Sequence, residues 1–229
     1  MLSSWGIVFE AVNVKDTPGA LEELKRLGAP LVPAVAVDER IVHGWNPRGL
    51  AELLGVSYAE PIQLSPKELV GRLEQILLAT QRALQQTPPE TIRARTPGGE
   101  RTLRDIGHHI FRLTLGFRDA ALEDRFPETW LLELPSAELT TGSAIAAYGS
   151  WVWEEIAQWF SAYASEDFAR SVQTYYGPQS LHALLERTTW HAAQHLRQVY
   201  TLLESAGIGL DQPLTAADYA GLPLPSQVW

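Results

Sequence analysis

The sequence predicts an α+β chain in two parts, a small α/β unit followed by a four-helix bundle. Short β-branched runs alternate with short helical patterns over residues 1–56, and four long amphipathic segments follow over residues 65–215. Residues 57–64 lie between the two parts, show no strong period and are predicted to be a linker. The Pro-rich residues 216–229 are predicted to form an extended tail.

The composition indicates a globular protein whose core is built by apolar burial. Of the 229 residues, 45% are hydrophobic, 20% are charged and none is cysteine. Disulfides and thiolate metal ligands are therefore excluded, and any thiol chemistry needs a thiol from another molecule. The net charge of -9 without a basic cluster argues against nucleic-acid binding. No apolar run approaches the ~20 residues that span a bilayer and no leader opens the chain, so we expect a cytoplasmic protein away from membranes.

The first part is predicted to have the order β-α-β-β-α. Its elements are a strand over residues 7–11, a helix over 18–27, strands over 31–37 and 41–44, and a helix over 48–54. The strand segments are rich in β-branched and aromatic residues. In the first helix, Leu21, Leu24 and Leu27 follow helical spacing and Gly28 marks its end.

Four long helices are predicted in the second part. The first begins at Ser65, because Ser65 and Glu68 have the spacing of a capping box and Pro66 occupies the first helical position. The last ends at Gly207. Four helices of about 20 residues, joined by loops, predict a bundle. They span residues 65–86, 102–123, 143–164 and 178–206.

His191 and His195 are the first candidates for a metal site. They lie four positions apart, which places both imidazoles on one face of a helix, about one turn apart. Both fall inside the apolar stripe of their helix, so they are expected to point into the bundle. Two buried imidazoles need hydrogen-bond partners or a metal ion. The stripe contains Leu181, Leu184, Leu185, Thr188, Ala192, Val199 and Leu202.

His109 on the second helix is the candidate third ligand. It lies roughly 80° from the centre of the apolar stripe of that helix, at the edge of the buried face. His108 lies about 180° from the centre and is predicted to face water. His43 and His182 have no partner in the sequence, and we interpret both as structural or surface residues. The stripe contains Leu103, Ile106, Ile110, Leu113 and Phe117.

Three neutral imidazoles without thiolates or carboxylates suit Zn²⁺, Ni²⁺ or Fe²⁺, of which we expect Zn²⁺. Three protein ligands leave a coordination position open, which is typical of catalytic rather than structural sites. Gln198, near the same face of its helix, is a candidate to orient a ligand imidazole or a bound water molecule. No catalytic side chain is predicted. The alternative is a bundle without metal, in which water and side chains satisfy the histidines.

Two segments resemble the DinB/YfiT-like family of metal-binding four-helix bundles. Residues 102–109 (TLRDIGHH) resemble its second-helix segment, in which a Thr-Leu pair precedes the first metal histidine. Residues 191–198 (HAAQHLRQ) resemble its fourth-helix His-x-x-x-His segment with the trailing Gln. The resemblance covers about residues 63–215 and selects His109. It implies a divalent metal held by three histidines, and frequent homodimers.

The same resemblance indicates what the protein does. Some members of the family are thiol-dependent transferases or isomerases that use a low-molecular-weight thiol, such as the mycothiol-dependent maleylpyruvate isomerase. The first hypothesis is therefore a metal-dependent transferase or isomerase acting on a small-molecule substrate, or a hydrolase. The alternative is a non-catalytic binding or stress-response protein that the metal stabilises.

Residues 28–35 (GAPLVPAV) resemble the segment of a glutaredoxin that carries its cis-proline, and Pro33 is the matching position. The first strand, the cysteine motif and most of the first helix of that thioredoxin-like fold are missing, so we expect an incomplete thioredoxin-like unit. Either the unit is naturally degenerate, or the start of the chain lies downstream of the true one. We favour the second explanation, because a sheet without its first strand exposes an unpaired edge.

Overall fold

The chain forms two compact units in this computed structural model, residues 1–63 and residues 64–229. The predicted linker over residues 57–64 falls at the division between the units, although its residues 58–62 lie outside the described part of the chain. The structure describes residues 2, 5–14, 16–29, 32–44, 46–57, 63–97, 101–163, 166–225 and 228.

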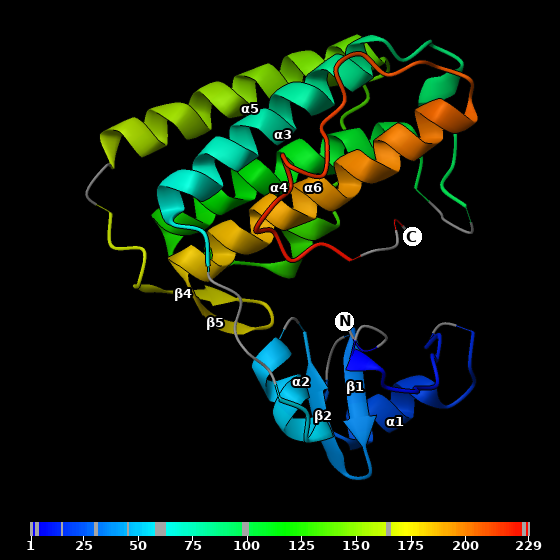
Figure 1. The fold of residues 1–229 in the computed structure, drawn as a ribbon, viewed down its shortest axis with the longest axis vertical. Coiled ribbons are helices and arrows are strands. Elements are labelled where there is room, and N and C mark those ends of the chain that lie inside the picture. The colour runs from blue at the N-terminus through cyan, green and yellow to red at the C-terminus, as the bar shows by residue number, and fades with distance from the viewer. Residues whose placement is uncertain are drawn as a thin grey trace. The chain divides into compact units, whose positions relative to one another are not determined.

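The first unit contains an antiparallel hairpin and two short helices (Figure 1). In the hairpin, Ala34 pairs with His43 and Val37 with Arg40. Asp38 lies in the turn between the strands and has a positive φ of 54°. The elements are α1 (Ala20–Arg26), β1 (Ala34–Val37), β2 (Arg40–His43) and α2 (Pro47–Leu54).

Local side-chain chemistry sets the bounds of α2. The side chain of Asn46 accepts a hydrogen bond of 2.8 Å from the backbone amide of Gly49, which caps the start of the helix. Gly55 ends the helix in the left-handed region, with φ 67°. The Val32–Pro33 peptide bond on the approach to β1 is cis.

The strand predicted over residues 7–11 is wrong. These residues are irregular, and Val8 is 98% exposed and Phe9 49% exposed. A strand needs a neighbour that pairs with its backbone groups, and the hairpin pairs only with itself among the described residues. The structure therefore does not confirm a thioredoxin-like sheet in this unit. Of the strand predicted over 31–37, residue 31 lies outside the described residues and β1 begins at Ala34.

Four long helices build the second unit, as the sequence predicts (Figure 1). Ser65 before α3 and Thr102 before α4 form capping boxes with the acidic residue three positions later. Thr141 and Ser180 accept a hydrogen bond from a backbone amide at the start of α5 and α6. The last residue of the third predicted helix, residue 164, lies outside the described residues. The helices are α3 (Pro66–Gln85), α4 (Leu103–Glu123), α5 (Gly142–Ala162) and α6 (Leu181–Ser205).

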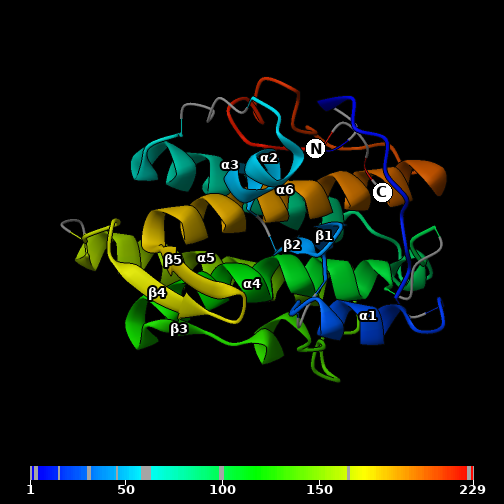
Figure 2. The same ribbon diagram turned by 90° about the horizontal axis from the view of Figure 1, so that it is seen from below.

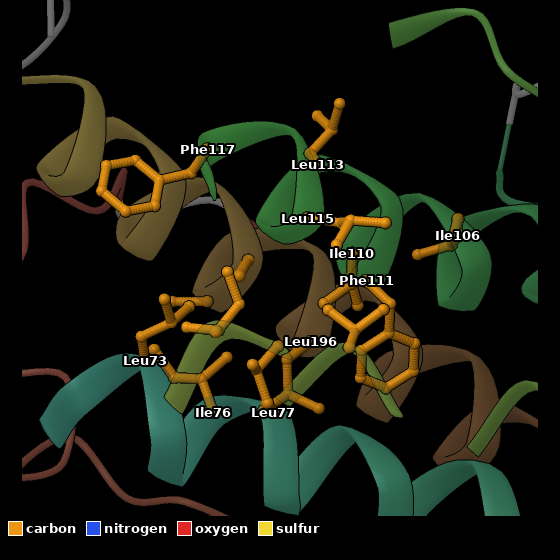
Figure 3. Packing of buried hydrophobic residues seen from close by; sticks show 14 of the residues in the cluster. Leu73, Ile76, Leu77, Ile106, Ile110, Phe111, Leu113, Leu115, Phe117 and Leu196 are labelled. Carbon is orange, nitrogen blue, oxygen red and sulfur yellow. The ribbon is translucent and has the colours of Figure 1, made fainter. Parts of the chain in front are cut away.

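The helices do not pack in chain order. α3 and α4 each pack against both α5 and α6 but make few contacts with one another, so they occupy opposite corners of the bundle (Figure 2). As a result α4 lies beside α6. Figure 3 shows apolar side chains of α3, α4 and α6 meeting in the core between them. Fully buried members include Leu73, Ile76, Leu77, Ile110, Phe111 and Leu196.

A small sheet at one end of the bundle is absent from the predicted elements. β3 runs parallel to β4, and β4 pairs antiparallel with β5. The helix predicted from residue 178 is therefore wrong at its start, since Pro178 lies in β5 and α6 begins at Leu181. Proline is tolerated there because β5 is an edge strand. The strands are β3 (Arg125–Phe126), β4 (Ser171–Thr174) and β5 (Gly177–Ser180), and two 3-10 helices are η2 (Thr91–Arg93) and η3 (Glu128–Leu131).

The chain after α6 packs back onto the bundle. Leu222 is 9% exposed and belongs to the core, and the carbonyl oxygen of Val228 accepts a hydrogen bond of 2.7 Å from Nε2 of Gln194. Of the predicted tail over 216–229, residues 226, 227 and 229 lie outside the described residues. Among the described residues, no helix has both the length and the apolar character needed to cross a bilayer.

Candidate metal centre

The structure brings His109, His191 and His195 together at the contact between α4 and α6. The ring of His109 lies 5.2 Å from that of His191 and 5.1 Å from that of His195, measured between centroids. The rings of His191 and His195, one turn apart on α6, lie 4.4 Å apart. One nitrogen from each ring lies within 4.8 Å of the other two. We call these three residues the histidine cluster.

The cluster is enclosed but still reachable. His109 is 5% exposed, whereas His191 and His195 are half-buried. Among the described residues, no hydrogen bond reaches the ring nitrogens of His109 or His191. Nδ1 of His195 donates to Oε1 of Gln198 at 2.6 Å. That bond leaves Nε2 of His195 with a free lone pair, the form in which imidazole binds a metal.

Gln198 is itself held in place. Its Nε2 donates to the carbonyl oxygen of Val228 at 3.1 Å, so its Oε1 is turned towards His195. The tail of the chain thus supports the ring orientation of one member of the cluster.

Burial keeps the cluster neutral. It lowers the pKa of His109 to about 2, and the positive charge of His195 lowers it further. Burial also lowers the pKa of His195 to about 4, partly opposed by the hydrogen bond that His195 donates to Gln198, and holds that of His191 well below its ordinary value. All three rings are uncharged at pH 7 and carry the lone pairs that a metal ion needs.

The donor set fits a divalent transition metal. The separation within 4.8 Å is close to that of ligands sharing one ion, since a Zn–N bond is about 2.0–2.1 Å long. No carboxylate belongs to the cluster among the described residues. Three neutral nitrogens suit Zn²⁺, Ni²⁺ or Fe²⁺ better than Mg²⁺ or Ca²⁺, which prefer oxygen ligands. Buried imidazoles without hydrogen-bond partners would otherwise be unfavourable.

Comparison with known proteins places this arrangement in a family. A family model described as the DinB superfamily matches residues 72–199, which include the whole histidine cluster. The chain belongs to the DinB superfamily. It is also similar to the solved structure of YfiT from Bacillus subtilis, described as a probable metal-dependent hydrolase with an unusual four-helix bundle topology. The TM-score is 0.51 at 17% sequence identity, over 67% of this chain and 96% of YfiT, and the likeness concerns the fold. No curated protein matches the chain.

His108 of this DinB-superfamily chain does not face water, and that prediction is wrong. Its side chain is 4% exposed and stacks on Tyr148 with ring centroids 5.4 Å apart. Every residue from Ile106 to Phe117 is buried, because α4 contacts α5, α6 and the segment around η3. A count of angles that assumes one buried face therefore misplaces His108. Its ring does not belong to the histidine cluster.

The other histidines and the nearby acid have local roles. Nε2 of His182 donates to the carbonyl oxygen of Leu64 at 2.8 Å, which ties α6 to the residue before the cap of α3. His43 lies in β2 of the first unit. Asp105 closes the capping box of α4 through the backbone amide and hydroxyl of Thr102.

Two arginines act on the pKa values of the histidine cluster, and the spacing of the histidines in the sequence does not identify them. After burial and the neighbouring histidines, the positive charges of Arg101 and Arg187 lower the pKa of His109 and of His191. Arg187 lies four positions before His191, so the sequence does hold a signal that places it one turn away on α6. Arg101 precedes α4, and no pattern in the sequence points to it.

Proposed function

We propose that this DinB-superfamily protein is a metal-dependent enzyme that holds one divalent ion through His109, His191 and His195. Zn²⁺ is the expected ion, with Ni²⁺ or Fe²⁺ as alternatives. The observation that carries the proposal is the convergence of three neutral imidazoles from α4 and α6, with nitrogens within 4.8 Å of one another.

An ion bound in this way supplies Lewis-acid chemistry and lowers the pKa of a water molecule or thiol towards neutrality. The chain itself contributes the rest. Half-buried His191 and His195 leave the cluster open to a small molecule on one side. Gln198 fixes the tautomer of His195 by accepting a hydrogen bond from the N–H group at Nδ1.

We favour transfer or isomerisation that uses a low-molecular-weight thiol. Since the chain has no cysteine, the thiol in such a reaction has to arrive as a separate molecule. One observation supports this choice of reaction. The segments around the three histidines resemble those of family members that use such thiols. A small-molecule substrate then occupies the same open side of the cluster.

Hydrolysis is the second candidate reaction. It is supported by the description of YfiT, a protein of similar fold, as a probable metal-dependent hydrolase. The two reactions differ in the nucleophile, which is the thiol in one case and water in the other. A non-catalytic protein that the metal only stabilises is the alternative to both. We also predict that the protein forms a homodimer and is cytoplasmic.

Removal of one ligand tests the proposal. In elemental analysis of protein purified without a His tag, we expect the wild type to carry one divalent ion per chain and His195→Ala to carry none. His182→Ala, a histidine of the same helix outside the cluster, is the control and should keep the ion. Turnover that survives in His195→Ala without metal would contradict the proposed function.

Titration of the metal-loaded protein separates the reactions. A panel of low-molecular-weight thiols that includes mycothiol should give saturable binding in calorimetry if the thiol is a reactant. Cleavage of simple esters or amides without any thiol would favour hydrolysis. Chelation that lowers the melting temperature, with neither thiol binding nor cleavage, would leave the non-catalytic alternative.

A further inference from the structure

We propose that Arg187 forms an anion-binding subsite beside the histidine cluster, and that the substrate carries an oxyanion group such as a carboxylate or a phosphate. This inference rests on the proposed function, because it names the chemical class of molecule that reaches the metal-binding site.

Arg187 is placed to reach a molecule bound at the cluster. It precedes His191 by four positions and His195 by eight, so all three side chains leave α6 on the same face, one turn apart. Its side chain is half-buried, like those of the two histidines.

Two tyrosines from the turn between β4 and β5 hold the guanidinium of Arg187. Nη2 donates to the hydroxyl of Tyr175 at 3.1 Å, and Cζ lies 4.7 Å from the ring centroid of Tyr176. These contacts fix the orientation of the guanidinium. They do not neutralise it, because both tyrosines are uncharged partners.

The guanidinium of Arg187 has no carboxylate oxygen within 4.0 Å among the described residues. Arg112, Arg118 and Arg170 each form an ion pair with a carboxylate. A half-buried cation without a counterion is poorly compensated, and a bound anion would compensate it. Arg72 and Arg82 are also half-buried without such an ion pair, but of these three arginines only Arg187 lies one turn from the histidine cluster on α6.

The charged side chains that act on the cluster are cationic. Apart from the histidines, which are neutral at pH 7, they are Arg101 and Arg187. No carboxylate belongs to the cluster among the described residues. A divalent ion would add two further positive charges, so the site attracts anions although the chain carries a net charge of -9.

Oxyanions match this geometry. The planar guanidinium presents paired N–H donors that fit the two oxygens of a carboxylate or of a phosphate. Arg187 and the nearer histidine of α6 lie one helical turn apart, a spacing of about 5–6 Å between their Cβ atoms. A molecule with one oxyanion at Arg187 and its reacting group at the cluster would bridge these neighbouring turns. Small dicarboxylates have this length and serve as probes.

The test uses the full-length protein loaded with Co²⁺, whose visible absorption reports on ligands near the ion. Metal content is measured first. Succinate, its neutral analogue succinamide and inorganic phosphate are then titrated, with calorimetry as a second readout. We expect both anions to bind and succinamide not to bind. The relative affinities of succinate and phosphate identify the oxyanion.

Arg187→Met should weaken succinate binding about tenfold or more, the effect of losing a charge-assisted hydrogen bond in a half-buried site. Its metal content should stay at the wild-type level. Arg72→Met on α3 is the matched control and should bind succinate like the wild type. Arg187→Gln should show a similar loss and provides a second test should Arg187→Met fail to fold.

Two results would overturn the inference: equal binding of succinate and succinamide, or wild-type affinity for both anions in Arg187→Met and Arg187→Gln. Failure of the proposed function looks different. A wild-type protein that takes up no metal contradicts that function, while anion binding to Arg187 remains measurable by calorimetry.

Discussion

The two units of the chain place leucines at similar helical spacing and bury them to very different degrees. In α3, Leu69, Leu73 and Leu77 are all 0% exposed. In α1, no residue is buried, and Leu21 is 46% exposed although it begins the spaced series that predicted this helix. Both helices form where the spacing of leucines predicts them, but of the two only α3 packs against two other helices, α5 and α6.

This difference shows what periodicity does and does not predict. A spaced row of leucines identifies the face that a helix would bury, but burial requires neighbouring elements. α3 packs against α5 and α6, whereas α1 makes few contacts with other elements among the described residues. The buried core and the candidate site both belong to the bundle. Changes in the bundle should therefore have larger effects than changes in the first unit.

The largest effect on the bundle is expected on its stability at acidic pH, because the bundle contains the histidine cluster. Burial lowers the pKa of His109 to about 2 and of His195 to about 4, and it lowers that of His191, whereas unfolded histidines titrate near 6.5. Below about pH 6.5 the unfolded chain binds more protons than the folded one, so stability falls as pH falls. Each group contributes at most about 1.4 kcal/mol per pH unit in the metal-free protein.

Urea unfolding of the metal-free protein at pH 7.5 and pH 5.5 measures this effect. The unfolding midpoint should drop on acidification, and the drop should be smaller in His195→Gln because one of the three titrating groups is gone. Equal drops in the wild type and the variant would show that the cluster does not titrate in this way.

A pair of leucine substitutions, one in each unit, compares how much a leucine side chain contributes to stability in the two units. Leu196→Ala removes a side chain that is 0% exposed between α3 and α4 and should lower the free energy of unfolding by about 2–5 kcal/mol. Leu21→Ala in α1 should change it by less than about 0.5 kcal/mol. Chemical denaturation followed by circular dichroism gives both values. A similar loss in the two variants would mean that α1 is buried in solution.

Gln198→Leu should weaken metal binding about 10–100-fold, because His195 loses the acceptor that fixes its tautomer. Gln194→Leu is the matched control, since Gln194 also donates to the carbonyl oxygen of Val228, while its Oε1 accepts from Arg197. Competition with a metal indicator measures both affinities. If the two variants lose affinity equally, the anchoring of the tail, not the contact with His195, accounts for the effect.

The smallest effect is expected when the first unit is removed. A chain that begins at Gln63 retains the capping box at Ser65 and the partner of His182 at Leu64. Its metal content should equal that of the full chain. Loss of the metal would contradict the assignment of the site to the bundle alone.

Features set by neighbours in sequence could be predicted without the structure. The capping boxes at Ser65 and Thr102 join residues three positions apart, so the starts of α3 and α4 are correct. His191 and His195 are one turn apart on any helix, and their apolar surroundings on α6 indicated that they point inward.

Features set by distant contacts could not be predicted. The ring of His108 is covered by Tyr148 of α5, and nothing in the spacing of residues along α4 reveals that contact. Residues 7–11 resemble a strand locally but find no partner among the described residues. β4 and β5 form a hairpin, and β4 also pairs with β3, which is distant in the sequence. No local pattern reveals that pairing, so the predicted start of the last helix is misplaced.

The central claim is that one ion is shared by imidazoles of two helices. Anomalous diffraction at the absorption edge of the metal that X-ray fluorescence identifies tests it most directly, on crystals of protein purified without a tag. We predict a single anomalous peak per chain within bonding distance of His109, His191 and His195. A peak elsewhere, or a metal-free cluster in protein grown with ample zinc, would contradict the claim.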